Sequence, residues 1–217
     1  MRKALLFRLL DPVGGLVARQ LARPSGWFGR TVMTRVLNHG NRELIEATLD
    51  GVALAPESRL LDVGFGGGLL LELARRRGVR RLAGIDPSDA AVARLRGGPS
   101  WLGGAELRLE VGVVEALPFE DASFDVVAST NTVYFWLELA RAFAELHRVL
   151  RPGGLLTMGF SGAAKLRRFG GITRHGFRFH ENGELVEAAS SAGFTDVRLV
   201  ELHRRVTTGD FVLRGSR

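Results

Sequence analysis

Three glycines and two aspartates at fixed spacing are the residues of this chain best suited to chemistry. Asp62 is followed by Gly64, Gly66 and Gly68, and Asp86 comes 20 residues after Gly66. Because glycine lacks a Cβ, the backbone at these positions can turn tightly and lie directly against a ligand. A carboxylate about 20 residues further along can accept both hydroxyls of a ribose. The pattern predicts a site for a cofactor that contains a nucleoside.

The segments that must position these residues are typical of an α/β sheet. Arg59–Val63 and Arg81–Ile85 are short apolar runs bounded by turn residues, as expected of buried parallel strands. Between them, Leu69–Arg77 has helical composition, and Gly78 is a stop signal. The predicted helix therefore begins at the glycines, and Asp86 follows the next strand.

Two classes of nucleoside cofactor fit this arrangement, and the glycine spacing separates them. A dinucleotide fingerprint requires G-x-G-x-x-G or a terminal alanine, so that the helix can approach the strand beneath a pyrophosphate. Leu69 occupies that third position here. The order is instead Asp62-x-Gly64-x-Gly66-x-Gly68, which resembles motif I of the class I S-adenosylmethionine (SAM) methyltransferases.

Further segments resemble later signatures of the same family, in the same order, so the resemblance covers about residues 43 to 200. They are Glu115–Phe119, Ser123–Val127 and Arg148–Gly154. The same region predicts strands, helices and a turn, namely a strand at Phe124–Ser129, a helix at Leu137–Leu150, a turn at Arg151–Gly154, a strand at Leu155–Phe160 and a helix at Glu181–Ala192. The alternating runs Thr195–Leu202 and Val206–Leu213 are expected to form an antiparallel edge.

The resemblance implies a fold, a cofactor and a reaction. The expected fold is α/β, a Rossmann-like three-layer sandwich around a seven-stranded, mostly parallel sheet with an antiparallel last strand. The expected cofactor is SAM, and the expected reaction is direct methyl transfer to a small, apolar or aromatic molecule. The residues expected to contact the cofactor are Asp62, Gly64, Gly66, Gly68, Asp86, Pro87, Ser88, Val114, Glu115 and Asn131.

One position departs from the pattern of the family. Many members carry an aspartate that accepts a hydrogen bond from the adenine amino group, whereas this chain has Val113. A valine side chain cannot make that bond. The backbone of Val114 or the carboxylate of Glu115 would have to contact the adenine instead.

Candidate catalytic residues are Tyr134, His39 and His175. In the family the segment that contains Tyr134 passes the reactive methyl group, and an aromatic face stabilises a cation by about 0.5–2 kcal/mol. The alternative for Tyr134 is a residue at the start of a helix that packs into the core. A general base is needed only if the acceptor is protonated at working pH, and neutral His39 or His175 would suit that role. The alternative for each histidine is a structural or exposed position.

The expected organisation is one domain, residues 43–217, preceded by a basic amphipathic extension, residues 1–42, with an insertion near residues 161–180 that covers the acceptor. The extension contains eight basic residues against Asp11, which equals the net charge of +7 of the whole chain. It could cap the acceptor pocket. Alternatively, residues 1–22 could lie on an anionic membrane, where each basic group contributes about 1 kcal/mol. That position would bring a phospholipid or quinone-type acceptor within reach.

The composition excludes several kinds of site and partner. The chain has no cysteine, which excludes disulfides, thiolate metal sites and a cysteine nucleophile, and is compatible with a reducing cytoplasm. Its five histidines lack metal-ligand spacing, so we predict no metal. No RNA-binding module accompanies the basic extension, which makes a nucleic-acid partner improbable. A catalytically silent SAM-binding protein is left open as an alternative, and the sequence does not determine the oligomeric state.

Overall fold

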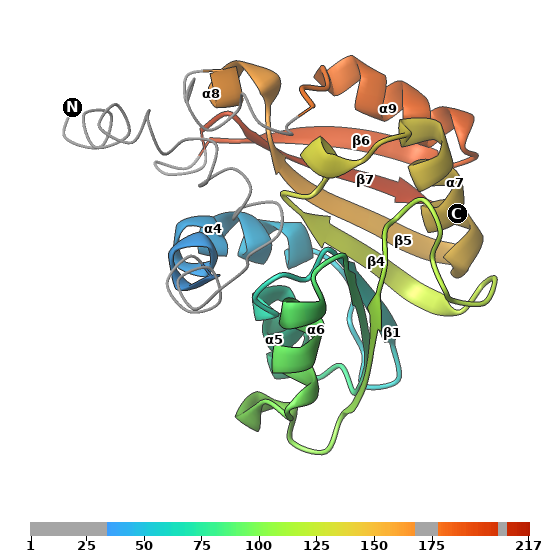
Figure 1. Ribbon diagram of the computed structural model, residues 1–217. Helices are drawn as coiled ribbons and strands as arrows, with labels where there is room; N and C mark the ends of the chain where they lie inside the picture. Colours follow the sequence, from blue (N-terminus) through green and yellow to red (C-terminus); the bar gives the residue numbers. More distant parts are fainter. Residues whose placement is uncertain (1–33, 168–177, 204–207) are drawn as a thin grey trace.

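A seven-stranded sheet forms the centre of the computed structural model, which describes residues 34–167, 178–203 and 208–217 (Figure 1). The strand order is β3-β2-β1-β4-β5-β7-β6, and β7 runs antiparallel to both of its neighbours. The predicted mostly parallel sheet with an antiparallel last strand is therefore confirmed. The strands are β1 Arg59–Val63, β2 Arg81–Asp86, β3 Glu106–Val111, β4 Phe124–Thr130, β5 Leu150–Ser161, β6 Thr195–Leu202 and β7 Asp210–Ser216.

Helices cover both faces of this sheet, which makes three layers (Figure 1). The described helices are α4 Thr34–Leu49, α5 Leu69–Arg76, α6 Asp89–Arg96, α7 Leu139–Val149, α8 Ala163–Arg167 and α9 Asn182–Ser191, with short 3-10 turns η3 Ser100–Leu102 and η4 Val133–Phe135. Successive strand residues alternate between two buried clusters: Leu60 packs with α4, α5 and α6, whereas Leu61 packs with α7 and α9. This alternation follows from the two-residue period of a strand.

The segment Arg151–Gly154 differs from the prediction. It was expected to be a turn before a strand, but it lies inside β5, which begins at Leu150. The register explains the difference, because Phe124 pairs with Leu150 and Val126 pairs with Leu155. The additional residues on β5 form a bulge, and Gly153 supplies its left-handed backbone with φ of 75°.

Helix α4 crosses the boundary at residue 42/43 that the sequence suggested between extension and domain. Its second half packs on β5 at close range, since a Cβ on Gly159 would lie 2.1 Å from Thr48 Oγ1. The hydroxyl of Thr157 also donates to the Thr48 carbonyl at 2.6 Å. Residues 1–33 lie outside the described ranges. In those ranges, no helix has the length and apolar character needed to cross a bilayer.

Candidate functional site

The glycine turn joins β1 to α5 and depends on backbone conformations that favour glycine. Gly64, Gly66 and Gly68 have φ of 74°, 48° and 80°, all in the left-handed region. The Gly64 N–H donates to the Ile85 carbonyl at 2.7 Å, and the Gly68 N–H donates to the Phe65 carbonyl at 2.7 Å. The turn is therefore closed by its own backbone and by β2. The predicted strand, turn and helix at this place are confirmed.

Asp86 lies at the carboxyl end of β2 and holds both the glycine turn and the following helix. Its Oδ2 accepts from the Gly66 N–H at 2.8 Å, and its Oδ1 accepts from the Ser88 N–H at 2.9 Å. Ser88 in turn caps α6, because its Oγ accepts from the Ala91 N–H at 3.3 Å. Burial raises the pKa of the Asp86 carboxyl, while these backbone bonds and Arg94 oppose the shift. Each carboxylate oxygen retains accepting capacity that a ribose hydroxyl could use.

Asp62 is a buried acid whose charge is not compensated by the described residues. Its side chain lies in β1 with 2% exposure, and its Oδ2 has no hydrogen-bond partner there. Burial raises the pKa of this carboxyl well above its ordinary value, and the nearby Asp86 adds to the shift. A buried carboxylate is costly unless a cation or donor compensates it. The site therefore fits a ligand that brings both a cationic group and a ribose, which is the chemistry of SAM.

Arg94 is a residue of this site that the sequence reasoning missed. It projects from α6, and its Nη2 donates to the Gly66 carbonyl at 2.6 Å. Its charge also interacts favourably with Asp86. Arg94 thus braces the glycine turn at the Gly66 carbonyl. Its position two turns beyond Asp86, on the helix that Ser88 caps, is the signal that could have identified it.

The carboxyl end of β4 meets the glycine turn, because β1 and β4 are parallel neighbours with Val63 beside Ser129. The Ser129 hydroxyl donates to the Val63 carbonyl at 2.8 Å and also contacts the Thr132 hydroxyl. A Cβ on Gly64 would lie 2.3 Å from Thr132 Cγ2, so the two loops are in tight contact. Asn131, which was expected near the cofactor, follows β4 with φ of 58°.

Tyr134 is part of η4 and is almost fully buried in the core cluster. Its hydroxyl donates to Asn131 Oδ1 at 2.9 Å and accepts from the Ser161 N–H. Burial raises the pKa of Tyr134 further above its already high ordinary value. The phenol is therefore protonated at neutral pH and cannot serve as a general base. Its contact with an acceptor stays a prediction.

Glu115, in the loop after β3 where adenine contacts were expected, binds another loop of the protein. The Oε1 of Glu115 accepts from the Leu137 N–H at 2.6 Å, which ties this loop to the one after η4. Val114 is buried, whereas the side chain of Val113 is 45% exposed. Pro87, across the same end of the sheet, is half-buried. The structure thus supplies apolar side chains and backbone groups here, and the adenine contacts stay a prediction.

The sequence favoured two histidines as bases, His39 and His175. The side chain of His39, on α4, and all of His175 lie outside the described part of the chain. A third one, His180, is described and has a buried Nε2 without a hydrogen-bond partner in that part. No cluster of three or more His, Asp or Glu residues suited to a metal occurs among the described residues, and the absence of a metal stays a prediction.

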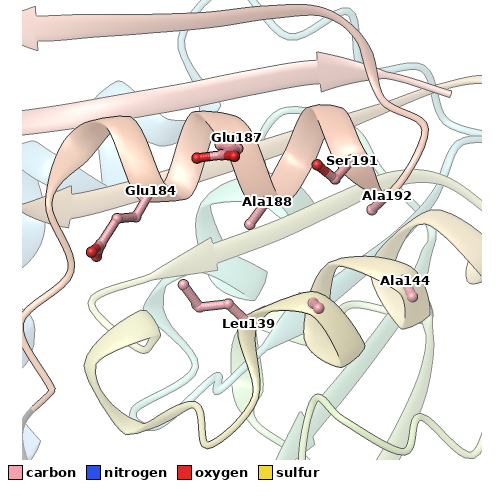
Figure 2. Close-up of a pocket in the computed structure, with 8 residues that line it drawn as sticks. Leu139, Ala144, Glu184, Glu187, Ala188, Ser191 and Ala192 are labelled. Atoms are coloured by element: carbon pink, nitrogen blue, oxygen red, sulfur yellow. The ribbon is translucent and has the colours of Figure 1, made fainter.

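A groove between α7 and α9 is separate from these residues (Figure 2). It is lined by Leu139, Ala140, Ala144, Glu184, Glu187, Ala188, Ser191 and Ala192. None of the expected cofactor residues contributes to it. The groove lies between two packed helices, and none of its lining residues belongs to the carboxyl ends of β1, β2 and β4.

Comparison with known proteins agrees with this geometry. Residues 61–158 match the model of a methyltransferase domain. A malonyl-[acyl-carrier protein] O-methyltransferase of Methylococcus capsulatus is 36% identical over 73% of this chain and 60% of its own length. A demethylmenaquinone methyltransferase of Roseiflexus castenholzii is 34% identical over 57% of this chain and 50% of its own length. The chain thus spans only about half to three fifths of these curated relatives.

A solved structure shares the fold at lower identity. It is the putative methyltransferase of Haloferax volcanii in complex with the methyltransferase activator Trm112, with a TM-score of 0.75, 18% identity and coverage of 87% of this chain and 95% of that one. This likeness concerns the fold alone. The domain match, the curated relatives and the strand order together support a class I SAM-dependent methyltransferase, as the motifs predicted.

Proposed function

We propose that this chain binds SAM at the glycine turn and transfers its methyl group to a small apolar or aromatic acceptor by in-line displacement. The observation that carries the proposal is the buried Asp62, whose Oδ2 has no hydrogen-bond partner in the described structure, next to the acid Asp86. When bound, SAM supplies a methyl group on a sulfonium leaving group. The protein has mainly to orient the two reactants and exclude water.

Each residue of the site then has a defined task. The glycines let the backbone lie against the cofactor, and Asp86 accepts from the ribose hydroxyls while it holds Gly66 and Ser88. Asp62 compensates the cationic part of the cofactor. The exposed Val113 and the backbone of Val114 contact the adenine.

The apolar character of the acceptor is supported by the residues after β4. Phe135 is half-buried and lies edge-on to Tyr134, with ring centroids 6.2 Å apart. Leu137, two residues further on, is 66% exposed. These side chains border the end of β4 next to the glycine turn. They favour a quinone-type or other aromatic acceptor, in line with the demethylmenaquinone methyltransferase among the relatives.

An acidic acceptor is the second candidate, because a relative acts on malonyl-[acyl-carrier protein]. Residues 161–180 contain five basic residues and no acid. Arg178, at the end of this segment, is exposed and bonds to the loop after η4, where its Nη1 donates to the Leu137 carbonyl at 3.0 Å. A carboxylate on a carrier protein would be attracted to such a charge distribution.

Calorimetry followed by turnover tests the proposal. We expect saturable binding of SAM and none of NAD, and then transfer of the labelled methyl group to one acceptor from a panel of phenols, naphthohydroquinones and malonyl-acyl-carrier protein. Transfer to the malonyl carrier alone would favour the second candidate. Binding of SAM without product across the panel would identify a silent SAM-binding protein instead, and binding of NAD in place of SAM would reject the cofactor assignment.

A further inference from the structure

His180 precedes α9 and has an unusual environment. Its side chain is 15% exposed, and its Nε2 is buried with no hydrogen-bond partner in the described structure. The other ring nitrogen, Nδ1, lies 3.8 Å from Glu184 Oε2. Glu184 is itself held in place, because its Oε2 accepts from the Glu181 N–H at 3.0 Å in a capping box. An orphaned buried nitrogen is rare in folded proteins and indicates a partner that binds there.

The segment that carries His180 is hydrogen-bonded to the residues that follow β4. The Arg178 N–H donates to the Tyr134 carbonyl at 2.8 Å, and the Arg178 side chain bonds to the Leu137 carbonyl. Tyr134 follows Thr132, which contacts the glycine turn. Since Nδ1 faces Glu184 and the two ring nitrogens lie on different sides of the imidazole, the buried Nε2 points away from that carboxylate.

We propose that His180 is the general base of the reaction and that Glu184 is its positioning residue. This inference rests on the proposed methyl transfer and narrows its acceptor to a hydroxyl compound, such as a phenol or hydroquinone, because a carboxylate needs no base. The acceptor proton passes to Nε2 while an oxygen lone pair forms the bond to the methyl carbon. The C–S bond breaks with its electron pair going to sulfur, and His180 later releases the proton to solvent.

Burial favours the neutral form of the His180 imidazole. Burial is the largest effect and lowers the pKa of His180 below its ordinary value, and Arg178 lowers it further. Glu184 opposes both and stabilises the imidazolium form. A neutral ring can accept a proton, and the nearby carboxylate then stabilises the charge that forms.

His180→Gln tests the assignment, and His147→Gln is the matched control. His147 is likewise a half-buried histidine with a lowered pKa, but it packs edge-on against Phe194 at 5.1 Å. We expect His180→Gln to lower kcat/KM for a hydroxyl acceptor at least about 100-fold, while SAM affinity by calorimetry and the melting temperature stay unchanged. The acid limb of the pH profile should disappear. Turnover within twofold of the unaltered protein would overturn the inference.

Glu184→Gln provides a second test, because glutamine can still cap α9 but lacks the charge. Removal of the carboxylate lowers the pKa of His180, so the acid limb of kcat/KM should move to lower pH. An unchanged limb would contradict the role of Glu184.

Nitrogen NMR of the histidine rings supplies a readout that does not depend on turnover. In the protein loaded with S-adenosylhomocysteine, phenol or a naphthohydroquinone should shift the His180 Nε2 resonance and leave His147 unaffected. If no hydroxyl probe shifts that resonance, the inference is wrong. A protein that turns over no acceptor at all refutes the proposed function, and in that case the NMR result alone decides the binding role of His180.

Discussion

Replacement of Asp62 by asparagine should stabilise the cofactor-free protein and weaken cofactor binding at the same time. The wild-type carboxylate is buried, its Oδ2 lacks a partner in the described structure, and it lies near Asp86. Leaving a buried polar group unpaired costs about 1–3 kcal/mol, and more for a charge. Asparagine keeps a polar atom at this position and removes only the charge and its repulsion with Asp86, so we expect Asp62→Asn to raise the free energy of unfolding at neutral pH by about 1–3 kcal/mol. Each kcal/mol shifts Tm by about 2–4 °C in a chain of this size.

The pH dependence has a defined sign. The folded-state pKa of Asp62 is raised well above its ordinary value by burial, so the folded state holds its proton more tightly than the unfolded state. The associated stability is fully present below about pH 4 and is lost as the pH rises through the folded pKa. The stability advantage of Asp62→Asn should consequently be small in acid, grow as the pH rises towards the folded pKa of Asp62, and level off above that pKa.

Cofactor binding should change in the opposite direction. A hydrogen bond to a charged group contributes about 1.5–3 kcal/mol, which corresponds to about 10–150-fold in Kd. Calorimetry with SAM and with S-adenosylhomocysteine measures this loss, and SAM should lose more because it carries the additional positive charge of the sulfonium.

Thermal melts from pH 4.5 to 8 without cofactor, together with that calorimetry, complete the test. Asp125→Asn is the matched control, because Asp125 Oδ2 accepts from the Arg59 N–H at 2.7 Å and the carboxylate also pairs with Arg151. Its replacement should not stabilise the protein. The reasoning is refuted if Asp62→Asn melts below the wild type at neutral pH, or if it binds SAM as tightly.

Three further substitutions test the geometry of the site. Gly64→Ala should destabilise the protein by about 2–4 kcal/mol, because its Cβ would lie 2.3 Å from Thr132 Cγ2 at a φ of 74°; Gly78→Ala, whose Cβ would meet nothing within 4 Å, should cost clearly less in denaturant melts. Asp86→Ala should lose most SAM binding in calorimetry, since the ribose would be left without its acceptor, and unchanged affinity would contradict the assignment. Arg94→Met should weaken SAM binding by about 2–10-fold through loss of the hydrogen bond to the glycine turn, and Arg94→Lys should have an intermediate affinity. Equal SAM affinities of the wild type and both variants would show that the Arg94–Gly66 hydrogen bond is not needed for binding.

Local sequence signals determined the strand bounds and the glycine turn of this molecule. The bounds of β1 and β6 match the prediction, because turn residues delimit each run and the apolar or alternating pattern within it is local. The glycine spacing likewise identified the turn, since glycine adopts left-handed backbone without the steric cost that a Cβ imposes. At Arg151–Gly154 the same local reasoning was wrong, because a bulge becomes visible only once β5 is paired with β4.

The tertiary structure alone decided which site residues make long-range hydrogen bonds and which are buried without a partner among the described residues. Arg94 reaches a carbonyl 28 residues away, and the Tyr134 hydroxyl bonds to a strand 27 residues further on. The uncompensated buried charge of Asp62 and the orphaned nitrogen of His180 are likewise not visible in the sequence. Whether a polar atom is buried, and whether it finds a partner, depends on segments brought together only by folding. Residue type and spacing therefore determined that a cofactor site exists. Packing determined which of its buried polar atoms lack a hydrogen-bond partner in the described structure.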